Sequence, residues 1–135
     1  MGARIPELTE AVDDHEIHPV DRFFSTLLAR VATKGALNAP WGLALAPSDF
    51  GTFSGDLLVG NFGNGMIHAY DQLSNVRWKV RGALKDSHGK ALKIDELWGL
   101  SFGNGGAAGP TNTLYFTAGP GGGSHGLFGS IQPGG

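Results

Sequence analysis

The sequence predicts an all-β protein made of two four-stranded antiparallel blades of the propeller type, the second of them incomplete. Three observations predict this fold. Trp-Gly-Leu at residues 41–43 returns at 98–100, and the match continues without a gap at a shift of 57 positions. The apolar runs in both halves alternate in the period of two that strands show. Glycine supplies 23 of the 135 residues and separates these runs, which is typical of short strands joined by tight turns.

The first blade is expected over residues 36–92. In its opening run, WGLALA, every second residue is large and the others are Gly or Ala, so the strand has one large-residue face and one small-residue face. Asn64-Gly65 is a strong signal for a tight hairpin. Strands are therefore expected at 41–46, 57–62, 66–71 and 76–82.

The second blade is expected over residues 93–131. Its runs WGLSF, LYFTA and GLFGSI match the first three strands of the first blade, and no fourth strand follows. Residues 132–135 are expected to form a flexible tail. An antiparallel four-stranded unit repeated after tens of residues is typical of a propeller. The alternative is a small β-sandwich whose halves are similar by chance.

The two halves also resemble a known family. The stretches ALNAPWGLALAPSDFGTFSGDLLVGNFGNGMIHAYD and IDELWGLSFGNGGAAGPTNTLYFTAGPGGGSHGLFGSI resemble the C-terminal part of a family of exported bacterial proteins of unknown function that is related to NHL-type β-propellers. The resemblance covers about residues 26–131. It implies a propeller fold, an extracytoplasmic bacterial location and no established activity. Family members are several-fold longer, so the chain looks like two terminal blades of a ring.

The N-terminal part differs from this pattern. Residues 1–25 do not follow the family and form a poorly defined segment. The apolar residues of 20–33 follow a spacing of i, i+3, i+4 and i+7, which predicts an amphipathic helix. The resemblance instead implies that residues 26–35 are the outer strand of a preceding blade, and this is the interpretation that we favour.

Composition excludes several classes of function. The formal net charge of −2 gives no basic surface for nucleic acid. The absence of cysteine excludes a disulfide framework, a thiolate metal site and a cysteine nucleophile. No apolar stretch has the length of a signal peptide or a membrane span. We therefore expect neither a nucleic-acid nor a membrane partner, and the sequence as given carries no export signal.

Residues with candidate chemistry gather where blade loops are expected to meet. In an antiparallel blade, the loop before the first strand and the loop between the second and third strands open at one end. At this propeller mouth the sequence places Asn38, Asn61, Asn64, Asp95, Glu96 and His125. The amide and carboxylate oxygen atoms of the Asn, Asp and Glu side chains suit a hard cation such as Ca²⁺. Asn and Asp are also common turn residues, and we favour that simpler interpretation, with no cofactor.

No residue is assigned a catalytic role, because neither a carboxylate pair nor a Ser-His-Asp arrangement is evident from the spacing. The leading interpretation is a non-catalytic propeller fragment that acts as a binding or interaction module. One alternative is part of a metal-assisted, lactonase-like hydrolase or lyase whose site needs further blades, which rests on fold analogy. The other alternative is a truncated product without a function of its own.

The repeat also predicts a core and an assembly. The large-residue faces of the paired runs are expected to be buried, namely Trp41, Leu43, Leu45, Leu57, Val59, Trp98, Leu100, Phe102, Leu114 and Phe116. Two blades leave two apolar blade faces open. We therefore expect self-association, such as three copies in a ring of about six blades, or binding to missing propeller blades.

Overall fold

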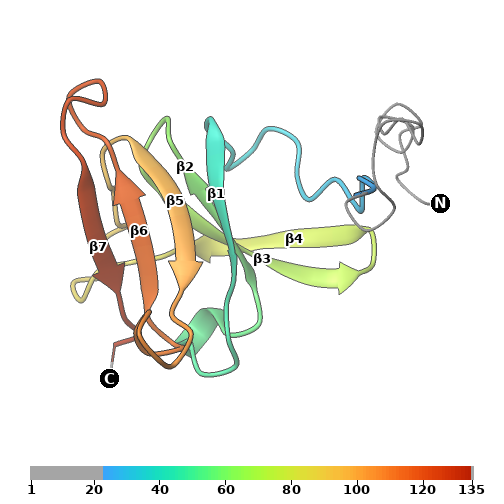
Figure 1. The fold of residues 1–135 in the computed structure, drawn as a ribbon. Helices are drawn as coiled ribbons and strands as arrows, with labels where there is room; N and C mark the ends of the chain where they lie inside the picture. Colours follow the sequence, from blue (N-terminus) through green and yellow to red (C-terminus); the bar gives the residue numbers. More distant parts are fainter. Residues whose placement is uncertain (1–22, 135) are drawn as a thin grey trace.

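The computed structural model describes residues 23–134, which form two antiparallel β-sheets in series along the chain (Figure 1). The first sheet has the order β1-β2-β3-β4 and the second has the order β5-β6-β7. The strands are β1 (Pro40–Leu45), β2 (Leu57–Asn61), β3 (Ile67–Ser74), β4 (Arg77–Ala83), β5 (Leu97–Phe102), β6 (Leu114–Ala118) and β7 (Leu127–Ile131). A short 3-10 turn, η2 (Gly51–Phe53), precedes β2. The prediction of an all-β fold with two antiparallel sheets is confirmed.

The two sheets repeat the same strand pairing. Leu43 lies opposite Val59 in the first sheet, and Leu100 lies opposite Phe116 in the second. Both members of the second pair follow those of the first by 57 positions. Each pairing is also irregular near the start of its first strand, at matching positions. The internal repeat of the sequence is therefore a repeat of strand register.

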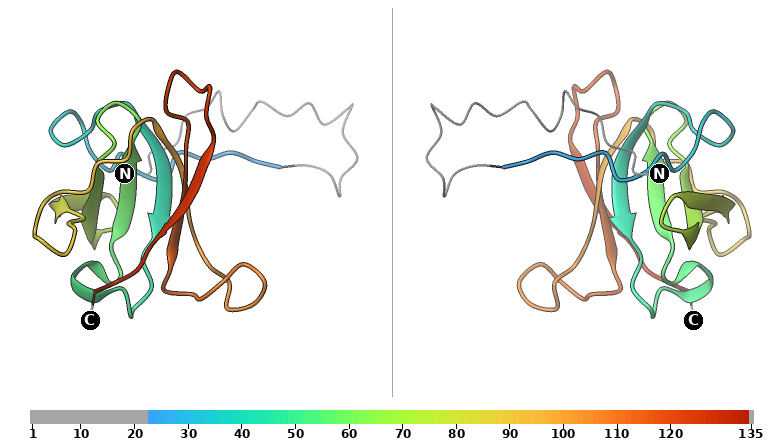
Figure 2. Two further views of the ribbon diagram at one scale, coloured as in Figure 1. Left: turned by 90° about the vertical axis from the view of Figure 1, so that its left-hand side faces the viewer. Right: turned by 90° about the vertical axis from the view of Figure 1, so that its right-hand side faces the viewer.

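The second sheet stacks on one face of the first, with β5 against β1 and β2 (Figure 2). Two glycines of the first sheet make this close approach possible. A Cβ atom added to Gly42 would lie 3.0 Å from Leu100 Cγ, and one added to Gly60 would lie 3.1 Å from Leu100 Cδ1. The core between the sheets consists of Ala46, Phe50, Leu58, Ile67, Ala69, Leu84, Leu97, Leu100 and Leu114.

On the opposite face of the first sheet, the described residues leave the side chains of β1 uncovered. Trp41, Leu43 and Leu45 are 64%, 61% and 67% exposed, so the expectation that they are buried is wrong for the described chain. The alternation predicts the strand correctly. However, the glycine and alanine side of β1 faces the second sheet, because the tight stacking requires small residues there.

The other seven residues of the predicted core are less exposed than Trp41, Leu43 and Leu45. Three are buried, namely Val59, Leu100 and Leu114. Four are half-buried, namely Leu57, Trp98, Phe102 and Phe116. The large-residue side of β5 faces the first sheet, whereas the corresponding side of β1 faces away from the second.

Residues 23–39, which precede β1, form neither a helix nor a strand. Residues 26–35 form neither the outer strand implied by the resemblance nor the amphipathic helix predicted by spacing. Phe23, Phe24 and Leu28 are exposed, whereas Leu27 and Val31 are half-buried, so only part of this apolar spacing corresponds to burial. Residues 1–22, most of the segment 1–25, and residue 135 of the expected tail lie outside the described residues.

Candidate functional site

The loops that carry the candidate residues lie at one end of the molecule. The loops before β1 and between β2 and β3 open at the same end as those before β5 and between β6 and β7 (Figure 1). The two sets also touch, because the Ile94 amide donates a hydrogen bond of 2.9 Å to the Gly65 carbonyl. The antiparallel arrangement therefore places the predicted mouth residues of both sheets on a common end.

Asn61, at the end of β2, is a structural residue. Its side chain is buried, its Oδ1 accepts a hydrogen bond of 3.1 Å from the Asn38 amide, and its Nδ2 donates one of 2.8 Å to the Ala36 carbonyl. These bonds fasten the incoming chain to the sheet. The Asn38 side chain in turn lies where a Cβ on Gly63 would be, so this turn requires glycine.

The residue before each first strand has a left-handed backbone. Ala39 has φ 49° and Glu96 has φ 51°, and the two are equivalent in the repeat. Their carbonyl groups accept equivalent hydrogen bonds of 2.9 Å from the Phe62 and Gly119 amides. Residues other than glycine adopt this conformation rarely. Its occurrence at both positions shows that the two sheets begin with the same backbone conformation. The sequence does not predict this conformation, because neither Ala nor Glu favours it.

Two further mouth residues are engaged in local hydrogen bonds. Glu96 Oε2 accepts a bond of 2.8 Å from the Gly122 amide and so holds the loop between β6 and β7. Asn64 Oδ1 accepts one of 3.1 Å from the Met66 amide within its own turn. Asp95 and His125 are exposed at the same end. The mouth residues thus shape the loops, which agrees with the turn interpretation of Asn64.

The described residues provide no cluster of acidic and histidine ligands. Within residues 23–134, no group of three or more His, Asp or Glu side chains could hold a metal ion. A Ca²⁺ site at the mouth therefore gains no support from side-chain clustering and stays a prediction.

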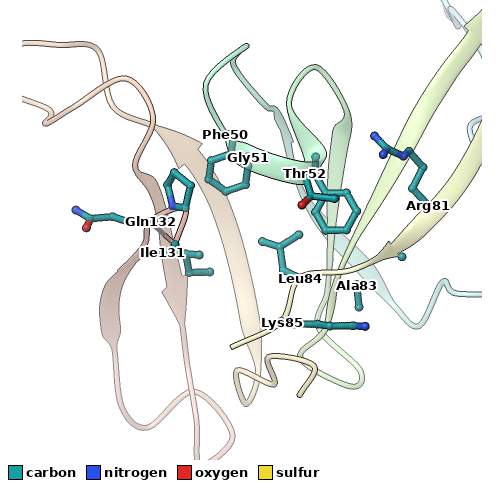
Figure 3. Close-up of a pocket in the computed structure, with 13 residues that line it drawn as sticks. Phe50, Gly51, Thr52, Arg81, Ala83, Leu84, Lys85, Ile131 and Gln132 are labelled. Carbon is teal, nitrogen blue, oxygen red and sulfur yellow. The ribbon is translucent and has the colours of Figure 1, made fainter. Parts of the chain in front are cut away.

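A hollow of about 460 Å³ lies between the two sheets, away from the mouth (Figure 3). Phe50, Leu84 and Ile131 contribute apolar walls, and Lys85 lies at its margin. Arg81 also lines it, and its Nη1 lies 3.0 Å from Oδ2 of the buried Asp56. The guanidinium group of the exposed Arg81 thus pairs with the buried Asp56 carboxylate.

The Arg81–Asp56 pair differs from what the sequence indicates. The alternating basic residues of β4 are typical of an edge strand protected by charge. Arg81 also lies over the Phe53 ring, with 5.7 Å between Cζ and the ring centroid. Asp56 is 25 positions away in the sequence, and no local pattern connects such a pair.

The face of the first sheet opposite the second sheet is covered over part of β3 and β4, where it holds two buried polar atoms. These are His68 Nδ1 and Trp78 Nε1, which have no hydrogen-bond partner among residues 23–134. His68 pairs with Val59 and Ala83, so it shares its face with Leu43. Burial lowers the pKa of His68 and raises the pKa of Tyr70, which lies on the same face.

Comparison with known proteins identifies relatives in a virus. The chain is 36% identical over 91 residues to uncharacterized protein R640 of Acanthamoeba polyphaga mimivirus, covering 67% of this chain and 16% of that protein. It is 36% identical over 110 residues to uncharacterized protein R648 of the same virus, covering 78% and 24%. It is 37% identical over 76 residues to uncharacterized protein L690, covering 56% and 19%. The chain thus spans a quarter or less of the curated relatives it matches.

The other comparisons give no match. No protein-family model matches the chain. No solved structure matches it. Among the described residues, no helix is long and apolar enough to cross a membrane.

These relatives correct the resemblance stated from the sequence. Similarity to uncharacterised mimivirus proteins contradicts the assignment to a bacterial exported family of the NHL type. The strings that carried that resemblance are short strands and Gly-rich turns, and many antiparallel β-proteins share this composition. The bacterial, extracytoplasmic location implied by it loses its basis.

Proposed function

We propose that the chain forms two adjacent blades of a β-propeller and acts as a non-catalytic binding module. The observation that carries this proposal is the stacking of non-equivalent faces. Leu100 of the second sheet packs on Gly42 and Gly60, whereas its equivalent in the first sheet, Leu43, lies on the opposite face. Each sheet thus has one face suited to the sheet before it and another suited to the sheet after it.

This arrangement favours a propeller over a sandwich of two similar halves. Equivalent faces meet across a twofold-like interface, whereas non-equivalent faces meet when units repeat in one direction around an axis. Blades of a propeller repeat in this second way. The matching strand registers and the left-handed residues at 39 and 96 are consistent with such a repeat.

The length of the relatives supports further units. The matched segment covers 16% of R640 and 24% of R648, so several stretches of similar size lie outside it in each protein. A propeller closes with about four to eight blades. We therefore infer that the relatives contain additional blades around the pair represented by this chain.

The state of the loop residues supports binding rather than catalysis. Asn61, Asn64 and Glu96 hold backbone groups of their own loops. The exposed surface is provided by sheet faces and loop ends, which are suited to contact with another protein. In this proposal the chain binds through these surfaces.

An experimental structure of full-length R648 tests the propeller. We expect the matched segment to form two neighbouring blades, with further antiparallel sheets around the same axis. A closed two-sheet sandwich without neighbouring sheets would contradict the proposal.

A melting experiment with this chain tests the non-catalytic part. We expect millimolar Ca²⁺, Mg²⁺ or Zn²⁺ to leave the melting temperature unchanged, because a bound ion would raise it by linkage. A saturable rise that disappears in Asp95→Asn would instead favour a metal-dependent mouth.

A further inference from the structure

The first sheet presents a large apolar face without a neighbour among the described residues. Trp41, Leu43 and Leu45 are each exposed by more than 60%. A shallow hollow of about 240 Å³ lies on this face, lined by Trp41, Leu43, Val59 and the adjoining backbone. Exposed apolar surfaces of this kind mark contact sites. We call the surface formed by Trp41, Leu43 and Leu45 the leading face.

The second sheet presents the complementary kind of surface on its far side. Leu100 and Phe116 lie on its covered side, so the alternating neighbours Gly99, Ser101 and Thr117 lie on the other. These residues correspond to Gly42, Ala44 and Gly60 of the first sheet, which accept the second sheet. We call the surface formed by Gly99, Ser101, Thr117 and Phe128 the trailing face.

The strand pairing identifies Phe128 as a residue of an uncovered interface. Phe128 lies opposite Thr117, as Ile67 lies opposite Gly60 in the first sheet. Ile67 is fully buried beneath the second sheet, whereas Phe128 is 74% exposed. Its ring stacks on the Tyr115 ring, with 5.5 Å between the centroids. The same position is therefore covered in one sheet and open in the other.

The chain thus exposes both halves of an interface that it already contains once. Inside the chain, the large residues of β5 pack on the small residues of β1 and β2. The leading face repeats the large half, and the trailing face repeats the small half. The equivalent strand pairings of the two sheets show that Leu43 of the leading face corresponds to Leu100 of the internal interface.

We propose that copies of this chain associate head to tail, with the leading face of one copy on the trailing face of the next. This inference rests on the proposed propeller function and names the partner of its sheet faces. Such an interface joins different surfaces on the two copies, so it generates a closed ring or an open chain. Two to four copies supply about four to eight blades, the usual range for a closed propeller.

Sedimentation and native mass spectrometry on the whole chain test this association. We expect the 14.1 kDa chain to form oligomers of two to four copies as its concentration rises. Leu43→Asp and Gly99→Val should each give monomers, because one places a charge on the leading face and the other fills the trailing face. Leu73→Asp is the matched control and should still assemble. Leu73 is 51% exposed, but it lies near the end of β3, beyond the residues of β3 that pair with β2.

Mixing the two monomeric variants gives the sharpest result. Leu43→Asp retains an intact trailing face, and Gly99→Val retains an intact leading face. An equimolar mixture should therefore form a one-to-one heterodimer that grows no further. Leu45→Lys and Ser101→Arg replace these variants if circular dichroism shows that either is unfolded, because both residues are exposed.

The outcomes separate this inference from the proposed function. A wild-type chain that stays monomeric, a Gly99→Val chain that still assembles, or a mixture without heterodimer would overturn head-to-tail association. If the trailing face instead binds a further blade of a longer protein, the wild-type chain will be folded and monomeric. The structure of full-length R648 would then test the blade arrangement separately.

Discussion

Single residues decide which face of each strand is covered. Gly42 and Gly60 bring the second sheet close, because any side chain there would meet Leu100. The sequence alternation correctly predicts that β1 has one large and one small face. It cannot choose between them, because both faces are compatible with burial and only the stacked sheet selects one. The pairing of buried Asp56 with the exposed Arg81 was equally unpredictable, since the two residues are distant in the sequence.

A pH prediction belongs to His68. Burial lowers the pKa of its imidazole in the folded state from the ordinary value of 6.5. The unfolded chain therefore binds the proton more tightly, and the free energy of unfolding should fall as the pH drops below about 6.5. Urea denaturation at pH 7.5 and 5.5 should show a smaller difference for His68→Gln than for wild type.

The exposed His88 provides the control for this experiment. His88→Gln should leave the pH dependence of the wild type unchanged. An equal pH dependence in wild type and His68→Gln would contradict the lowered pKa of His68 in the folded state.

At the scale of elements, strands are easier to predict than the segments between them. All seven strands overlap runs that the sequence predicts as strands, and the register of β1 with β2 returns in β5 with β6. The segment before β1 was not predicted correctly, because only part of its apolar spacing is matched by burial, as exposed Phe24 and half-buried Leu27 show. The loops before β1 and β5 also depend on left-handed residues that have no glycine signal.

Two leucines test which face of the stacked sheets is internal. Leu114 on β6 is fully buried in the core, so Leu114→Ala should lower the free energy of unfolding by about 2–5 kcal/mol. Leu43 on β1 is 61% exposed, so Leu43→Ala should cost only about 0.5 kcal/mol. Chemical denaturation of dilute protein measures both values. Equal losses for the two variants would mean that Leu43 is buried within the monomer.

At the scale of the whole molecule, the direction of stacking connects the fold with the proposed assembly. The chain covers a quarter or less of the viral relatives it matches, and the two sheets meet through non-equivalent faces. In the proposed propeller, such a repeat continues until the units close on themselves. The repeat in the sequence predicts uncovered sheet faces, but only the stacked arrangement identifies which faces these are.

The central claim is that the large-residue face of the second sheet packs on the small-residue face of the first. Nuclear Overhauser effects from the Leu100 methyl groups test it most directly, measured on isotope-labelled protein diluted until it is monomeric. The account predicts strong effects to the α-protons of both Gly42 and Gly60, and none between the Leu43 methyl groups and β6. Effects from Leu43 to Leu114 or Phe116, with none from Leu100 to either glycine, would contradict it.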